Sequence, residues 1–238
     1  MDRKNIIEIK KGQVGTGLLI ENDGYMTLDS EDNKLLKESV ESFRAGEIKE
    51  LPNPFIVSAV FQKFGIENAN GRIYPEAILK REVEKYQTAI KERRAYGELN
   101  HPEASSIDLG RLSINIIELH WVGHTLVGKL ELPITEGFRR YGIVSTLSDM
   151  AAQWLISGLK IGVSSRGLGT VSQMGGKVVV NDDYEIVCWD VVSQPSTPNA
   201  WIEMEDQKLQ PYIQETEKKE GETITENKFS KFEQWLNS

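Results

Sequence analysis

The run from Lys160 to Gly169, Lys-Ile-Gly-Val-Ser-Ser-Arg-Gly-Leu-Gly, places two hydroxyls and a guanidinium between glycines, where an ordinary strand would carry apolar side chains. A serine here could act as a nucleophile, because glycine permits the close backbone approach that a neighbouring oxyanion pocket requires. The backbone N–H groups of Ser165, Arg166 and Gly167 are candidate donors to that oxyanion, and Arg166 could add charge or order the loop. Taken by itself, the run is more typical of a serine-rich edge strand bent by glycines.

A serine nucleophile needs a base, and histidine is the usual one. The chain has three histidines. His120 and His124 flank a predicted Val-Gly turn and are typical of exposed turn residues, whereas His101 lies between a predicted strand end and Pro102, on a short loop suited to hold a base. No histidine follows Ser164, which excludes the α/β-hydrolase arrangement, where the serine lies in G-x-S-x-G and precedes its histidine.

A carboxylate that accepts a hydrogen bond from the far ring nitrogen of the histidine would orient the imidazole and fix its tautomer. Asp190 is the favoured candidate, because it is an ionisable residue between Trp189 and Val191 on a predicted apolar strand. Asp108, seven residues beyond His101, is an alternative. A serine–histidine dyad without a carboxylate is a further one.

No metal site and no cofactor are expected. The chain has one cysteine, Cys188, no His-Glu-x-x-His motif, and neither a P-loop nor a dinucleotide-binding fingerprint. A single thiol between Val187 and Trp189 is more typical of a small buried hydrophobic residue than of a nucleophile, and it fits a reducing cytosol.

The composition excludes some partners. With 238 residues, 39% hydrophobic and 27% charged, the chain is typical of a soluble globular protein, and it has no signal-peptide-like stretch. No segment approaches the ~20 apolar residues of a membrane span. The net charge of −8 argues against nucleic-acid binding, which needs clustered Lys and Arg. We expect a cytosolic protein without a membrane or nucleic-acid partner; its oligomeric state, a homo-oligomer included, stays open.

The elements that must position these residues are mainly strands. Pro75 opens a helix in which Leu79, Val83, Tyr86 and Ile90 form one apolar stripe. Two more helices are predicted, one capped by Ser30 and running to Phe43, and one at residues 136–157. Strands are predicted at residues 6–9, 55–61, 95–100, 112–116, 125–132, 160–173, 177–180 and 184–193, several of them joined as hairpins. This pattern predicts an α+β fold, an antiparallel sheet or barrel flanked by helices.

Three regions follow from the composition along the chain. Residues 1–50 are predicted to be an irregular leader or pro-segment, and residues 51–203 hold the main domain. Residues 204–238 are dominated by Glu, Lys, Gln and Thr, which is typical of a solvated, flexible tail.

Four runs, taken together and in order, resemble the prohead core proteases of myovirus-type tailed phages, relatives of the herpesvirus assemblin maturation proteases. They are Asn70-Gly-Arg-Ile-Tyr-Pro75, Gly97-Glu-Leu-Asn-His-Pro102, Gly162-Val-Ser-Ser-Arg-Gly-Leu-Gly169 and Pro195-Ser-Thr-Pro-Asn-Ala-Trp201. The resemblance aligns His101 with the family's catalytic histidine and Ser164, next to Ser165, with its nucleophile. Asp190 falls where close relatives carry an aspartate. The implied fold is an assemblin-like β-barrel surrounded by helices, with residues 51–203 as the protease domain.

The resemblance also implies an activity. The family cleaves scaffold (core) proteins and the major capsid protein inside the assembling prohead, in the host cytoplasm, and then cleaves itself. Close relatives cleave after Glu in Leu/Ile-x-Glu sites, and Arg72, Arg111 or Arg166 would receive that glutamate. The tail contains Ile213-Gln-Glu215 and Ile224-Thr-Glu226, so Glu215 and Glu226 are candidate self-cleavage sites. The alternatives are a non-catalytic scaffold-binding module and a small-molecule esterase or amidase.

Overall fold

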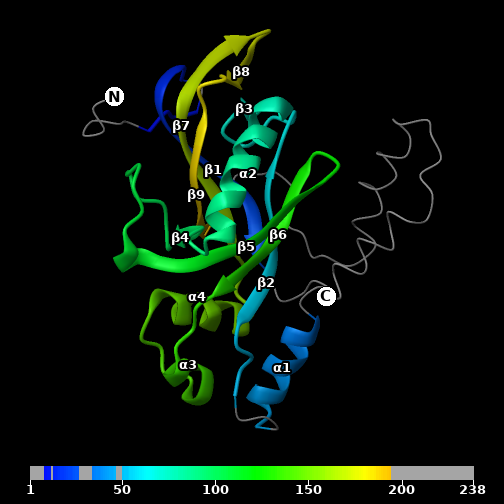
Figure 1. The fold of residues 1–238 in the computed structure, drawn as a ribbon, viewed down its shortest axis with the longest axis vertical. Coiled ribbons are helices and arrows are strands. Elements are labelled where there is room, and N and C mark those ends of the chain that lie inside the picture. Colours follow the sequence, from blue (N-terminus) through cyan, green and yellow to red (C-terminus); the bar gives the residue numbers. More distant parts are fainter. Residues whose placement is uncertain (1–7, 12, 27–33, 47–49, 194–238) are drawn as a thin grey trace, which may run out of the picture.

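The computed structural model describes residues 8–11, 13–26, 34–46 and 50–193 (Figure 1). A nine-stranded sheet dominates this part of the chain. Its strands are β1 (Gly15–Met26), β2 (Phe55–Lys63), β3 (Arg72–Ile73), β4 (Tyr96–Glu98), β5 (Leu112–Val122), β6 (Thr125–Leu132), β7 (Ile161–Met174), β8 (Lys177–Val180) and β9 (Glu185–Val192). The named strands pair antiparallel, except for the short parallel pair of β3 with β8.

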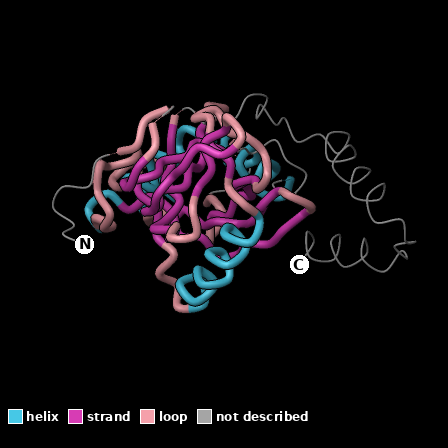
Figure 2. The backbone as a smooth tube through the Cα atoms, turned by 90° about the horizontal axis from the view of Figure 1, so that it is seen from above, coloured by secondary structure: helices cyan, strands magenta, loops and turns pink. Residues whose placement is uncertain are grey.

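Helices lie around this sheet. In the described ranges they are α1 (Lys34–Arg44), α2 (Glu76–Lys91), α3 (Glu136–Tyr141), α4 (Leu147–Ile156) and the 3₁₀ helix η3 (Leu109–Arg111). The helix α2 packs against β5 and β9, whereas α4 packs mainly against β5 and β6. Figure 2 shows the strands gathered at the centre of the molecule and the helices at its periphery.

The predicted α+β organisation with a mainly antiparallel sheet is confirmed, but the predicted barrel is not. The strand order is β3-β8-β7-β1-β2-β6-β5-β4, with β9 paired to β7, and this order does not close on itself among the described residues. An isolated bridge does join Leu99, directly after β4, to Val191 of β9. That bridge brings the chain that follows β4 next to β9.

The largest buried apolar cluster fixes the orientation of β9. Trp189 is fully buried in it and meets the rings of Phe61 and Tyr86 edge-on, with centroids 5.7 and 5.0 Å away. Val191 and Val163 of the neighbouring strand belong to the same cluster. Because side chains alternate along a strand, Cys188 and Asp190 must then point to the opposite face of the sheet.

Two predictions about elements are wrong. The helix predicted at residues 136–157 is divided into α3 and α4, because Gly142 ends α3 in the left-handed region (φ 69°) and Thr146 opens α4 with a capping box to Asp149. The irregular leader predicted over residues 1–50 is wrong for Gly15–Met26, since β1 lies inside the sheet, between β7 and β2. Ser30, the predicted cap of the first helix, lies outside the described residues.

Gly97 sets how closely β4 approaches its neighbours. A Cβ atom at this position would lie 2.1 Å from the carbonyl oxygen of Trp189 and 2.7 Å from Cγ1 of Ile114. We expect Gly97→Ala to lower the free energy of unfolding by about 1–3 kcal/mol, because β4 would have to move away from β5 and β9. Urea denaturation followed by circular dichroism measures this change.

The control for this variant is Gly137→Ala in α3, where the nearest atoms lie 3.9 Å from the added Cβ. That change should leave the stability unaltered or raise it, by up to about 1 kcal/mol, since alanine favours a helix over glycine. Equal destabilisation by the two variants would contradict the role given to Gly97.

Candidate active site

The pairing of β7 with β9 brings four polar residues to one face of the sheet. Ser164 is directly opposite Asp190, and Arg166 is directly opposite Cys188. Directly opposed side chains in an antiparallel pair have Cβ atoms about 4.5–5.5 Å apart. All four residues are fully buried. The register of two strands therefore creates a polar cluster inside the protein.

His101 reaches this cluster from the segment that follows β4. The N–H of Asn100 donates to the carbonyl oxygen of Val191 at 2.8 Å, which ties the segment to β9. Asn100 itself has φ 62°, in the left-handed region that asparagine tolerates better than most residues. This conformation turns the chain so that the next residue, His101, lies over the face that carries Ser164 and Asp190.

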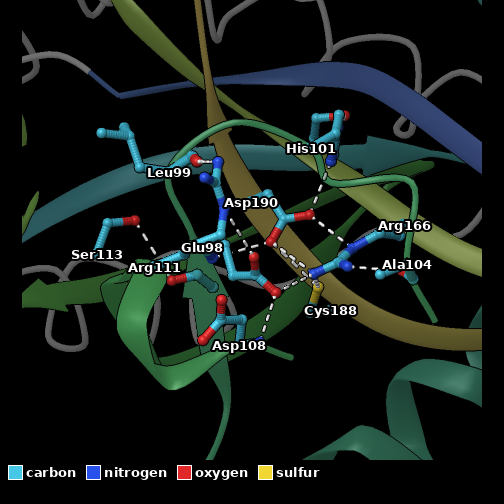
Figure 3. Close-up of polar contacts among 12 residues, drawn as sticks. Glu98, Leu99, His101, Ala104, Asp108, Arg111, Ser113, Arg166, Cys188 and Asp190 are labelled. Carbon is cyan, nitrogen blue, oxygen red and sulfur yellow. Dashed lines mark hydrogen bonds and ion pairs between the residues drawn. The ribbon is translucent and has the colours of Figure 1, made fainter. Parts of the chain in front are cut away.

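The imidazole of His101 lies between the serine and the aspartate. Its Nδ1 is 2.7 Å from Oδ2 of Asp190 (Figure 3), and its Nε2 contacts Oγ of Ser164. When Nδ1 donates to the carboxylate, Nε2 is left as the acceptor for the serine hydroxyl. This is the arrangement in which a histidine can remove the proton of a serine.

Asp190 is held as an ionised carboxylate. Oδ1 accepts from the N–H of Glu98 at 2.9 Å and from Arg166 at 3.2 Å, and Oδ2 lies 2.9 Å from Nε of Arg166. Burial by itself would raise the pKa of Asp190, but the hydrogen bond from His101, the charge of Arg166 and the Glu98 amide outweigh it and hold the pKa below its ordinary value. The carboxylate therefore stays charged at neutral pH, although it is shielded from water.

The serine hydroxyl is not open to solvent in this structure. Ser164 is fully buried, and the side chain of His101 is only 10% exposed.

Comparison with known proteins shows the family of this chain. Residues 18–209 match the sequence profile of a family described as prohead core protein serine protease. The chain belongs to this family. A member from Enterobacteria phage T4, the prohead core protein protease, is 31% identical over 183 residues, which cover 76% of either chain. The resemblance inferred from the four sequence runs is thereby confirmed.

A solved structure supports the fold of this protease. The bacteriophage T4 capsid assembly protease superimposes with a TM-score of 0.59 at 24% identity, over 76% of this chain and 99% of that one. At this level of identity the superposition is evidence for the mixed α/β fold alone. The membership of the family rests on the sequence comparisons.

Arg166 of this protease serves the aspartate and is not open to a substrate. Its guanidinium is fully buried, with Nη2 2.9 Å from Oε1 of Glu98 and Nη1 2.7 Å from the carbonyl oxygen of Ala104 (Figure 3). Burial alone would lower the pKa of Arg166, but the charge of Asp190 and the hydrogen bond to Glu98 raise it above its ordinary value. The prediction that Arg166 orders the neighbouring chain agrees with these contacts, whereas a direct contact with a substrate glutamate does not.

The predicted oxyanion loop is wrong, because residues 165–167 form part of a strand that is paired on both sides. Ser165 pairs with Glu21 of β1 and Trp189 of β9, so its side chain lies on the face opposite Ser164, where its hydroxyl has no hydrogen-bond partner among the described residues. Gly167 is needed for a different reason, since a Cβ there would lie 2.4 Å from the ring of Tyr184.

One irregularity does occur beside the serine. Along β1, Glu21 pairs with Ser165 and Gly24 with Val163, so two residues of β1 are opposite the single residue Ser164. Such bulges are common next to active sites.

The two other arginines predicted to bind a substrate glutamate differ in their distance from the polar cluster. Arg111 lies near the cluster: its Nε is 3.3 Å from Oε2 of Glu98, it donates to the carbonyl oxygen of Leu99, and its side chain is 40% exposed. Arg72 is buried in β3 and donates to the backbone carbonyls of Ile9 and Ile20. These contacts leave Arg72 poorly placed to receive a substrate.

Asp108 is not the partner of His101. Its carboxylate caps η3 by accepting from the N–H of Gly110 at 2.8 Å. The predicted cleavage sites Glu215 and Glu226 lie outside the described residues.

Two residues of the cluster were missed as members of the site. The sequence assigns no role to Glu98, yet its backbone N–H contacts Asp190 and its carboxylate contacts Arg166. Cys188 is buried as predicted, and its thiol donates to Oδ1 of Asp190 at 3.2 Å. Burial raises the pKa of this thiol well above its ordinary value, so it stays protonated.

No group of three or more His, Cys, Asp or Glu side chains in the described ranges could hold a metal ion. In the same ranges, no helix has the length and apolar character needed to cross a membrane.

The ionised state of Asp190 leads to a prediction for acid stability. A carboxyl group whose pKa is lower in the folded protein stabilises the fold above its unfolded pKa, ~3.9, and loses this contribution as the pH falls through the folded value. The difference in unfolding free energy between wild type and Asp190→Asn should therefore shrink as the pH falls from about 5 towards 2. Urea unfolding at a series of pH values measures it.

Asp182→Asn is the control, since the side chain of Asp182 is 89% exposed and contributes at most a surface ion pair. This variant should differ little from wild type at any pH. A difference between wild type and Asp190→Asn that did not change with pH would contradict the ionised, partnered state described for Asp190.

Proposed function

We propose that this member of the protease family is a serine endopeptidase with Ser164 as nucleophile, His101 as general base and Asp190 as the carboxylate that orients the base. The observation that carries the proposal is the position of one imidazole, with Nδ1 2.7 Å from Oδ2 of Asp190 and Nε2 in contact with Oγ of Ser164. The three residues are far apart in sequence: Ser164 and Asp190 are opposite each other on the paired strands β7 and β9, and His101 comes from the segment after β4.

The mechanism follows from the two ring nitrogens. His101 Nε2 takes the hydroxyl proton as Oγ of Ser164 attacks the carbonyl carbon of a peptide bond. The imidazolium that forms keeps its Nδ1–H on Asp190, and the ionised carboxylate stabilises it. The proton then passes to the nitrogen of the leaving amine, and the C–N bond breaks. Water next hydrolyses the acyl-enzyme, with His101 again as the base.

The natural substrates we propose are the scaffold (core) proteins and the major capsid protein of a phage prohead, cleaved within the prohead in the host cytoplasm. The names of the T4 relatives, a prohead core protein protease and a capsid assembly protease, support this choice. Cleavage after Glu in Leu/Ile-x-Glu sites, self-cleavage after Glu215 and Glu226 included, belongs to the same proposal. No cofactor is required by the mechanism, which uses side chains alone.

Among the basic residues predicted to receive the substrate glutamate, Arg111 is the one we retain. It is bound to Glu98 and to the carbonyl oxygen of Leu99, two residues before His101, so its guanidinium is held close to the base. Its side chain is 40% exposed, whereas Arg166 and Arg72 are buried. A carboxylate arriving from solvent can therefore meet Arg111.

The first test concerns the nucleophile. Purified Ser164→Ala protein should keep its full mass over time, whereas the wild type should lose its tail and acquire new C-termini at Glu215 or Glu226. Loss of the nucleophile of such a unit typically lowers turnover by on the order of 10⁶-fold. Intact-protein mass spectrometry over a time course measures this.

Ser165→Ala is a matched control, because Ser165 is the adjacent serine, is equally buried and faces away from His101. It should be trimmed like wild type. Trimming of Ser164→Ala at the wild-type rate would refute the assignment. A wild type that neither trims nor reacts with a fluorophosphonate would instead favour a scaffold-binding module, and turnover of simple esters without a glutamate preference would favour an esterase.

The second test concerns specificity. Arg111→Gln should lower the preference for a peptide with Glu over its Gln analogue by about 10- to 100-fold, because a hydrogen bond to a charged group is worth about 1.5–3 kcal/mol. The ratio of kcat/KM for the two peptides measures this preference.

Arg93→Gln is the control. Arg93 is also an exposed arginine, but it forms an ion pair of 2.5 Å with Glu131 and none with Glu98 among the described residues. It should leave the preference unchanged. An unaltered ratio in Arg111→Gln would remove Arg111 from substrate recognition and leave the nucleophile assignment untouched.

A further inference from the structure

Glu98 is a fully buried carboxylate that the proposed chemistry does not use directly. Burying a charge costs several kcal/mol unless it is paired and hydrogen-bonded. The residue lies at the end of β4, three positions before His101. Its contacts therefore indicate what this costly charge supports.

Within the described ranges, the polar contacts of the Glu98 carboxylate and backbone N–H lead towards the proposed catalytic cluster or the segment around it. Oε1 accepts from Nη2 of Arg166 at 2.9 Å and from the N–H of Asp108 at 3.0 Å. Oε2 lies 3.3 Å from Nε of Arg111. The backbone N–H of Glu98 donates to Oδ1 of Asp190 at 2.9 Å (Figure 3). Glu98 thus contacts Asp190 directly through its backbone and indirectly through Arg166.

We propose that Glu98 is a positioning residue for the proteolytic reaction: its carboxylate fixes the Arg166 guanidinium against Asp190, and Asp190 in turn orients His101 towards Ser164. The inference rests on the proposed function. It deepens that proposal, because it names what determines the position of the third member of the catalytic unit.

The geometry of Arg166 explains why a second carboxylate is needed. Nε and Nη2 of Arg166 both approach Asp190, and Nη2 is shared with Glu98. Because the guanidinium is planar and rigid, anchoring Nη2 on Glu98 fixes the orientation in which the other donors meet Asp190. Without this anchor, Arg166 would keep Ala104 and Ser106 as carbonyl partners, but these lie on the other side, at Nη1.

Charge gives a second reason. Glu98 and Asp190 carry two negative charges and Arg166 one positive charge, so this buried trio has one negative charge in excess. The proton that His101 takes from the serine neutralises that excess. Removing the charge of Glu98 would leave Asp190 and Arg166 balanced, and the imidazolium would lose part of its stabilisation. Arg111 offsets this only partly, because its exposed side chain is screened by solvent.

The experiment measures the rate at which a fluorophosphonate labels Ser164. This reagent carries no glutamate, so its reaction reports the activation of the serine and does not depend on recognition by Arg111. Glu98→Gln keeps an oxygen for the Asp108 N–H and removes the charge. We expect labelling to slow by about 10²-fold, the loss typical of a misplaced catalytic group. The kcat for a peptide should fall in parallel, while KM changes little.

A double-mutant cycle separates positioning from general stabilisation. If Glu98 acts through Asp190, the Glu98→Gln change should cost little further labelling rate in an Asp190→Asn background, because groups that act as one unit are not additive. The same loss in both backgrounds would overturn the proposal.

Glu82→Gln is the matched control. Glu82 is also a buried glutamate, with ion pairs to Arg81 at 2.9 Å and Lys85 at 2.8 Å and a backbone N–H donor at Ile186. It lies on α2, and this variant should be labelled at the wild-type rate once the folded fractions are matched by thermal unfolding. Equal losses in Glu82→Gln and Glu98→Gln would reduce the role of Glu98 to stability and overturn the proposal.

Two further outcomes are distinguishable. Labelling of Glu98→Gln at the wild-type rate, with Ser164→Ala unlabelled, overturns the positioning role and leaves the proposed function intact, whereas labelling of Ser164→Ala refutes the function itself.

If Glu98→Gln does not fold, Glu98→Asp decides: it keeps the charge but withdraws the carboxylate by one methylene. A rate between those of wild type and Asp190→Asn supports the proposal, and the wild-type rate overturns it.

Discussion

The burial of the Arg166 guanidinium between Asp190 and Glu98 is the interaction on which the arrangement of the site depends. A buried charge is tolerated only when its partners meet it with good geometry, so these three side chains constrain one another. Each comes from a different strand: β7, β9 and β4. The pairing of β7 with β9 and the approach of β4 must therefore be correct before the cluster can form. The geometry of the proposed catalytic site is in this way a consequence of sheet assembly.

The apolar side of the sheet also determines how Asp190 is oriented. Trp189 and Val191 lie in the main hydrophobic cluster, which fixes the face to which Asp190 points. A slip of one residue in the pairing would exchange these faces and bury the aspartate among aromatic rings. The large cost of that alternative is a reason for the register to be unique. Hydrophobic burial thus selects the orientation, and the ion cluster then completes it.

Much of this could be predicted from the sequence, because strand alternation and chain order are local properties. Motif runs and an acidic residue on an apolar strand predict His101, Ser164 and Asp190 as site residues, and the structure brings these three side chains together. The prediction of an oxyanion loop was wrong, since a glycine such as Gly167, which would suit a flexible turn, also suits the close packing of Tyr184 on a strand. Glu98 could not be predicted as a member of the site, because a glutamate usually lies at the surface and only the tertiary contact with Arg166 reveals its burial.

The same contacts explain how His101, the proposed base, is held in place although it lies outside regular secondary structure. The segment after β4 is bound at Asn100 to β9, and its carbonyls at Ala104 and Ser106 accept from Arg166. Moving this segment away from the serine would separate Arg166 from two of its partners inside the protein. Since unsatisfied buried groups are costly, the free energy that keeps the ion cluster closed also keeps His101 over Ser164. A loop on the surface would offer no such constraint.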